Sequence, residues 1–161
     1  MAYCLILVDA ASMPDTSLFA DLGQGLVAFA NAVLSNRDMS RFVSVALAYS
    51  GDIRSQEVEF GDVRQLMPAL PDETTCALLG VEDIEAACWQ LSRASGHARG
   101  RGCPAPSRFL LVLGKDKIEC PIPAGCTCLW AADIHEGAGK PSRALLSMAG
   151  TMLHKMERRI P

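Results

Sequence analysis

The sequence predicts an α/β protein with a mostly parallel sheet, one antiparallel edge strand and helices on both faces. Four continuous apolar runs, each as long as a strand, have the composition of strands that are buried on both faces. Stretches with apolar residues three or four positions apart separate these runs, as amphipathic helices do. The 161 residues are half apolar and one fifth charged, which gives a single domain, 1–161, ample material for a core.

The first half of the chain predicts a buried strand, a helix and a hairpin. Residues 3–8 form the strand, and the loop 13–17 leads into the helix. Residues 42–49 form a second buried strand, and the alternating run 56–60 predicts a half-exposed edge strand paired with it. The helix shows one apolar stripe with spacings of three or four residues: Leu18, Leu22, Leu26, Phe29 and Val33.

Two glycines interrupt that helical stripe. Gly23 and Gly25 each cost a helix about 1 kcal/mol relative to alanine. Their presence favours a close approach of the helix to a strand or a loop.

The second half predicts two helices and two further buried strands. Residues 109–113 and 126–132 are the strands, and the Gly/Pro/Arg-rich segment 93–108 reads as an exposed loop. Ligands of such open sheets bind outside the carboxyl ends of the strands. Helical stripes are formed by Val81, Ile84, Cys88 and Leu91, and by Leu145, Ala149, Met152 and Met156. The segments of interest are therefore 9–17, 50–52, 72–76, 114–117 and 133–140.

Charge and composition exclude several classes of partner. The chain has 15 basic and 18 acidic residues, a formal charge of −3, so neither a nucleic-acid coat nor a polycationic membrane surface is expected. With 6% aromatic residues, a base-stacking platform is also disfavoured. No apolar run reaches the about 18–20 residues that span a bilayer, so we expect no membrane partner.

The N-terminal segment and the cysteines predict a cytoplasmic protein. Residues 1–15 lack the basic region of a secretory signal, and Asp9 follows the first apolar run at once. The seven cysteines are odd in number and lie mostly within apolar runs, which is typical of buried thiols in a reducing compartment.

Three other kinds of functional site are conceivable, but for each of them a purely structural role of the same residues is the better explanation. His135 follows a strand end, where it could act as a base with Asp9, but there is no G-x-S-x-G motif or other partnered nucleophile. The phosphate-binding glycine motifs are also absent, so a small-molecule substrate is not expected. A zinc site would need cysteines 103, 120, 126 and 128, whose spacing lacks C-x2-C pairs and fits core thiols better. An anion or RNA contact would use Arg93, Arg99, Arg101, Arg108 and His97, but a solvated, mobile loop is the better explanation because the chain is acidic overall.

Oxygen-bearing side chains at the strand ends predict a possible Mg²⁺ site. Asp9 and Ser12 follow the first strand, and Asp116 follows the third buried strand. Thr74 or Thr75 would add a hydroxyl from the segment before the second helix. A hard, six-coordinate cation takes ligands of this sort, with waters completing the shell. No other cofactor is expected.

These residues resemble a von Willebrand factor A-type domain, and the resemblance covers most of the chain. LILVDAASM is similar to the family's first strand with its D-x-S-x-S motif, one residue short, and FVSVALAYSGDI is similar to its next strand and hairpin. VRQLMPALPDETTCALLGVEDIEAAC and RFLLVLGKD resemble segments of bacterial TerY-like tellurite-resistance proteins. The resemblance implies six strands, one more than the pattern itself predicts. It also implies a degenerate metal-ion-dependent adhesion site, whose second Asp falls on Gly114, Lys115 or Asp116.

The resemblance implies a non-catalytic protein-interaction module, in a bacterial stress-response or tellurite-resistance complex. Its docking face would comprise the strand-end loops, with Glu73, Lys115, Asp116, His135 and Glu136. Lys115 either replaces the cation by pairing with Asp9 or points to water, and the sequence leaves both open. The competing function is a small α/β hydrolase or nucleotide-binding enzyme that uses the same strand ends.

Overall fold

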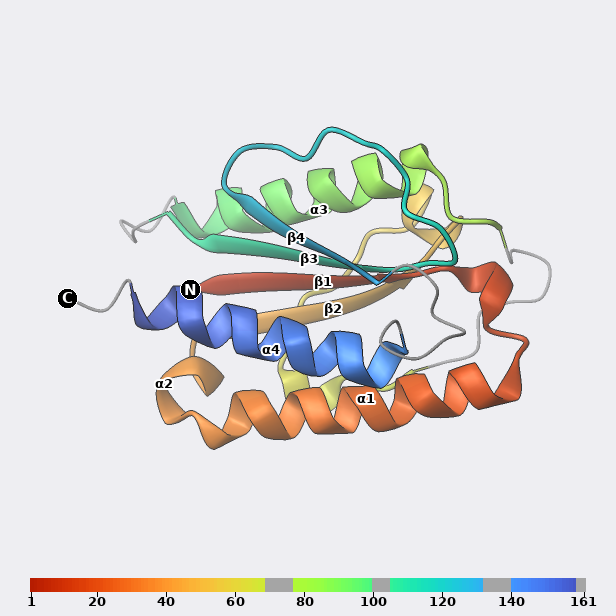
Figure 1. Cartoon of the computed structure of the whole chain (residues 1–161). Helices are drawn as coiled ribbons and strands as arrows, with labels where there is room; N and C mark the ends of the chain where they lie inside the picture. Colours follow the sequence, from red (N-terminus) through yellow and green to blue (C-terminus); the bar gives the residue numbers. More distant parts are fainter. Residues whose placement is uncertain (69–76, 100–104, 132–139, 159–161) are drawn as a thin grey trace.

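A four-stranded, all-parallel sheet forms the centre of the molecule (Figure 1). The computed structural model describes residues 1–68, 77–99, 105–131 and 140–158. The strand order is β2-β1-β3-β4, and all three pairings are parallel and in register over their lengths. The four buried strands expected from the sequence are confirmed: β1 (Ala2–Val8), β2 (Val43–Tyr49), β3 (Ser107–Leu113) and β4 (Cys126–Ala131).

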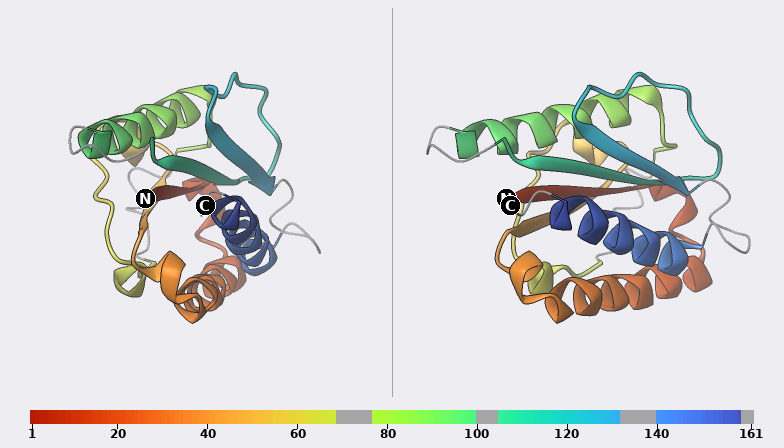
Figure 2. Two further views of the ribbon diagram at one scale, coloured as in Figure 1. Left: turned by 90° about the vertical axis from the view of Figure 1, so that its left-hand side faces the viewer. Right: turned by 60° about the vertical axis from the view of Figure 1, so that its left-hand side comes forward.

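Helices cover both faces of the sheet, as predicted (Figure 2). The helices α1 (Thr16–Ser35) and α4 (Pro141–Glu157) pack on one face, and α3 (Val81–Arg99) packs on the other. A short helix, α2 (Arg37–Ser40), follows α1. Successive strand residues point to opposite faces, so β1 sends Cys4, Ile6 and Val8 toward α1 and α4 and its intervening leucines toward α3.

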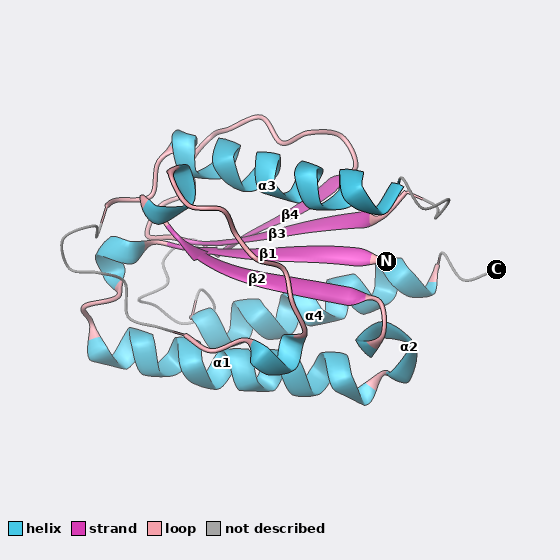
Figure 3. Ribbon diagram, turned by 180° about the vertical axis from the view of Figure 1, so that it is seen from behind, coloured by secondary structure: helices cyan, strands magenta, loops and turns pink. Residues whose placement is uncertain are grey.

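The predicted antiparallel edge strand at 56–60 is wrong. This segment is not part of a strand, and the described residues contain four strands instead of six. It passes over the outer edge of β2 (Figure 3) and meets it in one antiparallel bridge, in which Val45 and Gly61 exchange hydrogen bonds of 2.9 and 3.0 Å. Val58 and Phe60 pack into the core on the α3 side, and the Phe60 ring lies edge-on to Tyr3. The alternation of apolar side chains therefore reflects packing against the core rather than a strand ladder.

The helices α1 and α4 approach each other closely at Gly25. A Cβ atom at this position would lie 2.7 Å from the Cα of Ser142 and 2.8 Å from Leu145. The predicted close approach is confirmed for Gly25, but the partner is a helix rather than a strand or a loop. Gly23 has only ordinary contact with Pro68.

The helix α1 is long and apolar enough to cross a membrane, by length and composition alone. Its apolar residues alternate with polar ones, so no uninterrupted apolar run marks this property in the sequence. In the structure, its stripe of Leu18, Leu22, Leu26, Phe29 and Val33 is buried in the core on the α4 side of the sheet.

Candidate functional site

The loops that follow the strands meet at one edge of the sheet, which we call the carboxyl edge. Its described residues are 9–12, 50–51, 77–80 and 114–116. The Asp9 N–H donates to the Leu113 carbonyl over 2.8 Å, and the Ser50 N–H donates to the Val8 carbonyl over 2.9 Å. The prediction that the loops after β1 and β3 lie side by side is therefore confirmed.

Asp9 is almost completely buried at this edge, with 2% of its surface exposed. One carboxylate oxygen accepts a hydrogen bond from the Ser12 hydroxyl over 2.8 Å, and the other accepts from the Leu79 N–H over 3.1 Å. The structure thus brings together two of the predicted metal ligands, Asp9 and Ser12. The bond from Ser12 holds the 3₁₀ turn Ala10–Ser12 in place, and the bond from Leu79 holds the loop 77–80.

Two further polar side chains fasten the loop 77–80 to the edge. The buried Ser50 hydroxyl donates to the Ala77 carbonyl over 2.6 Å and accepts from the Ala10 N–H over 2.8 Å. The buried carboxylate of Asp83, near the start of α3, accepts from the Gly80 and Gly51 N–H groups, each over 2.8 Å. The backbone of Ala77, Leu79 and Gly80 is therefore hydrogen-bonded to side chains of the protein body.

Asp83 is ionised in spite of its burial. Desolvation opposes the charge, but the side-chain hydrogen bonds from Arg54 and the two backbone N–H groups outweigh it, so the pKa of Asp83 is lower than usual. Arg54 binds both oxygens of Asp83 over 2.8 Å and also contacts Glu82 at 3.3 Å. This network joins the segment after β2 to the start of α3, and its role is therefore structural.

Lys115 does not pair with Asp9, so that possibility is wrong. Lys115 and Asp116 are both exposed, and no ion pair joins Lys115 to Asp9. Both oxygens of Asp9 already accept hydrogen bonds, one from the Ser12 hydroxyl and the other from the Leu79 N–H. Leu79 packs so closely on Gly114 that a Cβ there would lie 2.9 Å from its side chain. The other possibility, that Lys115 points to water, fits its exposure.

The remaining predicted site residues, Glu73, Thr74, Thr75, His135 and Glu136, lie outside the described residues. The full Mg²⁺ site and the pair of His135 with Asp9 therefore stay predictions. Among the residues that the structure describes, no group of three or more His, Cys, Asp or Glu side chains could hold a metal.

The described cysteines are free thiols, and two of them, Cys4 and Cys88, are buried as expected. Cys120, Cys126 and Cys128 are half-buried on the α3 side of the sheet, whereas Cys103 lies outside the described part. Burial, with a smaller contribution from neighbouring thiols, raises the pKa of Cys128 to about 12. Burial also raises the pKa values of Cys120 and Cys126, as is usual for thiols packed against a core.

Leu78 is the feature of this edge that the sequence analysis missed. Its side chain is 73% exposed, although both neighbouring residues are hydrogen-bonded through their backbone to Ser50 and Asp9. Val81, at the first position of α3, is 39% exposed. An exposed leucine in a loop gives no signal in the sequence, because its exposure depends on contacts with residues far along the chain.

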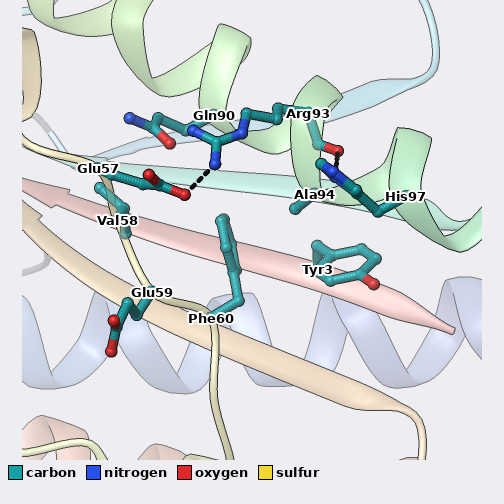
Figure 4. A pocket seen from close by; sticks show the side chains of 9 residues that line it. All are labelled: Tyr3, Glu57, Val58, Glu59, Phe60, Gln90, Arg93, Ala94 and His97. Carbon is teal, nitrogen blue, oxygen red and sulfur yellow. Dashed lines mark hydrogen bonds and ion pairs between the residues drawn. The ribbon is translucent and has the colours of Figure 1, made fainter.

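A separate open pocket of about 410 Å³ lies between the segment 57–60 and α3 (Figure 4). Tyr3 and Phe60 form its apolar part, with ring centroids 5.5 Å apart. Arg93 pairs with Glu57, and its backbone carbonyl contacts the His97 ring. Arg93 is thus neutralised by Glu57, and the remaining carboxylate of the lining, Glu59, forms no ion pair among the described residues.

The fold and the carboxyl edge define an α/β protein with a parallel sheet whose strand-end loops are held by buried polar side chains. Comparison with protein-family models, curated proteins and solved structures found no match to this chain. The resemblance to von Willebrand factor A-type domains accordingly stays a prediction from the sequence.

Proposed function

We propose that this chain is a non-catalytic protein-interaction module that docks through the carboxyl edge. The observation that supports this most directly is the presentation of Leu78. The loop around it is fixed because Ser50 donates to the Ala77 carbonyl and the Leu79 and Gly80 N–H groups donate to Asp9 and Asp83, yet the Leu78 side chain is 73% exposed. Because the backbone on both sides of Leu78 is already held in place, a partner that buries this side chain need not order the loop, which lowers the entropic cost of binding.

The surroundings of Leu78 have the composition of a docking surface. Val81 adds a second exposed apolar side chain, and Leu79 packs on Gly114, next to the exposed Lys115 and Asp116. An apolar centre with charged residues at its rim is typical of protein interfaces. The partner we propose is therefore a protein, and the resemblance to TerY-like proteins favours a bacterial stress-response complex in the cytoplasm.

The role of Asp9 in this proposal is structural. Its two oxygens hold Ser12 and Leu79, which shapes the docking loop without a metal ion. Excess Mg²⁺ is expected to leave the melting temperature unchanged, because a ligand that does not bind the folded state does not stabilise it.

Co-purification with variants on opposite faces tests the proposal. The tagged full-length chain and its Leu78→Glu and Lys115→Glu variants are purified from the source cells after crosslinking, and bound proteins are quantified by mass spectrometry. We expect at least one partner to be depleted about tenfold by Leu78→Glu, because a charge is then buried in the interface.

Val27→Glu is the matched control, since Val27 is 62% exposed on α1, away from the carboxyl edge. It should retain the partner, and circular dichroism should show that all variants fold. Equal recovery of every bound protein by Leu78→Glu and Val27→Glu would refute docking through this edge.

A further inference from the structure

The outer edge of β2 is only partly covered by the segment that crosses it (Figure 3). In the parallel ladder the Ser50 N–H bonds to β1, so the even-numbered residues of β2 face β1 and the odd-numbered residues direct their N–H and C=O groups outward. Val45 uses both of its outward groups to pair with Gly61. Among the described residues, Leu47 and Tyr49 have no backbone partner on this side. This end of β2, which we call the open β2 edge, is therefore available to another strand.

A cavity of about 310 Å³ lies at the open β2 edge. Its lining includes Leu47 and Tyr49, which pack on the α1 side of the sheet, and Ala48, which packs on the α3 side. Because residues from both faces line it, the cavity lies beside the backbone of β2 rather than over one face. Its opposite wall is the segment 56–59, in which residues 57–59 form no backbone hydrogen bond with any described residue. An extended segment inserted here would meet unpaired backbone groups on both sides.

The lining of this cavity is acidic. Asp52, Glu57 and Glu59 contribute carboxylates, and no lining residue is a cation. Glu57 pairs with Arg93 of α3, whereas Asp52 and Glu59 form no ion pair among the described residues. The Glu59 side chain points away from Arg93 (Figure 4). Two uncompensated carboxylates beside a strand edge favour a segment with lysine or arginine side chains, because opposite charges across a strand pair attract each other.

Two other occupants of the open β2 edge are disfavoured by the structure. The segment 56–60 does not close onto β2 itself, because Val58 and Phe60 are packed into the core on the α3 side and hold the segment away. A second copy of the chain, paired through the same edge, would bring its carboxylates against those of the first copy, and like charges destabilise a strand pair.

We propose that the open β2 edge binds an extended, lysine- or arginine-containing segment of a partner protein, which adds to the sheet as a further strand. Unpaired N–H and C=O groups at a sheet edge are a template for such pairing. Main-chain hydrogen bonds to Leu47 and Tyr49 supply the affinity, and ion pairs with Asp52 and Glu59 supply the preference for basic side chains. The proposal does not rest on docking at the carboxyl edge.

Selection of a phage-displayed library of random short peptides on the immobilised full chain tests this proposal. We expect enrichment of peptides with lysine or arginine at alternate positions. The double variant Asp52→Asn/Glu59→Gln should bind the strongest peptide about tenfold more weakly, because charge-assisted contacts are lost. N-methylation of alternate backbone nitrogens of that peptide should abolish binding, because it removes main-chain donors.

Glu85→Gln/Glu119→Gln is the matched control, because it neutralises two exposed carboxylates outside the cavity. It should leave the affinity for the peptide unchanged, as should Leu78→Glu at the carboxyl edge. Thermal unfolding should show that all variants are folded.

Amide hydrogen exchange, followed by NMR, locates the bound peptide. The N–H groups of Leu47 and Tyr49 should exchange more slowly when the peptide is present, whereas those of Ala46 and Ala48 already face β1 and should not change. The proposal is overturned if no peptide is enriched, if the double variant binds as tightly as the wild type, or if exchange at Leu47 and Tyr49 does not slow. A dimer of the free chain in which these two amides are already protected would also overturn it, because a second copy would then occupy the edge.

Discussion

At Gly25, α1 and α4 are too close for any side chain to fit between them without movement. The nearest atom to a Cβ would be the backbone Cα of Ser142, at 2.7 Å, which cannot rotate away as a side chain can. We therefore expect Gly25→Ala to lower the free energy of unfolding by about 1–3 kcal/mol, because overpacking outweighs the better helix propensity of alanine. Chemical denaturation measures this change.

Two other helical glycines provide the control for Gly25. Nothing lies within 4 Å of a Cβ at Gly96 in α3 or at Gly150 in α4. Alanine at either position should raise the stability by up to about 1 kcal/mol. A similar gain for Gly25→Ala would mean that the two helices separate easily at this point.

Asp83 contributes stability that depends on pH. Asp83→Asn should lower the free energy of unfolding by about 2–4 kcal/mol at neutral pH. This is somewhat less than the loss of one partner from a fully buried ion pair, because Arg54 is 37% exposed. The folded-state pKa of Asp83 is lower than usual, so its contribution is complete above the unfolded-state value near 4. It is lost as the pH falls through the lower folded-state value.

Urea denaturation of the wild type and Asp83→Asn from pH 7 down to pH 3 checks this sign. The difference in stability between the two proteins should shrink below about pH 4. A difference that stays constant with pH would show that the charge of Asp83 is not what stabilises the protein. Glu82→Gln is a suitable control, because Glu82 also contacts Arg54 but is 76% exposed and should matter little.

Single residues differed in how well the sequence predicted their roles. The contact of Asp9 with Ser12 was predictable, because the two residues lie three positions apart at a strand end. The bond from Leu79 to Asp9 was not, because it joins residues seventy positions apart. The same bond explains why the pairing of Lys115 with Asp9 was wrong: the carboxylate already had a partner from a distant loop.

Among the elements, α4 depends on α1 for the start of its helix. Its N-cap residue, Lys140, forms no side-chain cap, and the Asp21 carboxylate accepts hydrogen bonds from the Ser142 N–H and hydroxyl, each over 2.9 Å. Asp21→Ala should therefore lower the free energy of unfolding by about 1–2 kcal/mol, as the loss of a helix cap does.

A double-mutant cycle with Ser142→Ala separates the two bonds. Asp21→Ala removes both, whereas Ser142→Ala removes only the hydroxyl bond, so the second change should have little effect once Asp21 is absent. Fully additive effects would show that Asp21 stabilises the protein by some other contact.

The elements themselves were largely predictable, because their burial leaves a periodic pattern. The runs at 3–8 and 109–113 are apolar at every position, since both faces of the central strands are covered. The segment 56–60 shows the limit of such patterns. Alternating side chains indicate that one side is buried, but they do not determine whether the backbone joins a ladder, and here only Gly61 pairs with β2.

For the whole molecule, the parallel sheet separates two kinds of surface. The carboxyl edge carries exposed apolar and mixed-charge side chains, whereas cations lie near the edge where the strands begin, with Arg108 bonded to Ser92 of α3 and Lys155 of α4 bonded to Thr127. The sequence predicted the first edge as the place of function, because all strands end there. It could not predict the contacts at the second edge, because Arg108 meets Ser92 and Lys155 meets Thr127 only when the sheet and its helices are assembled.

Buried thiols make the whole fold sensitive to alkaline pH. Burial, with a small contribution from Cys126, raises the pKa of Cys4 to about 12, and burial together with neighbouring thiols raises that of Cys88 to about 11, from the ordinary 9.0. Burial also raises the pKa of Tyr49 to about 12, and its hydroxyl has no hydrogen-bond partner among the described residues. A raised pKa means that the neutral form is favoured in the folded state. The stability should therefore be complete below pH 9 and fall as the pH rises toward 11.

Denaturation curves between pH 8 and 11, with a reductant present, measure this fall for the wild type and for Cys4→Ala/Cys88→Ala. Between the unfolded-state value of 9.0 and the raised folded-state value, each buried thiol approaches a slope of about 1.4 kcal/mol per pH unit, because there the unfolded chain has lost the proton and the folded chain has not. Removing both should reduce the slope by about 2.7 kcal/mol per pH unit, whatever the cavities cost at neutral pH. Cys120→Ala, at a half-buried thiol with a smaller shift, should change the slope much less. An unchanged slope in the double variant would mean that these two thiols ionise equally in the folded and unfolded states, and that the core around them is open to hydroxide.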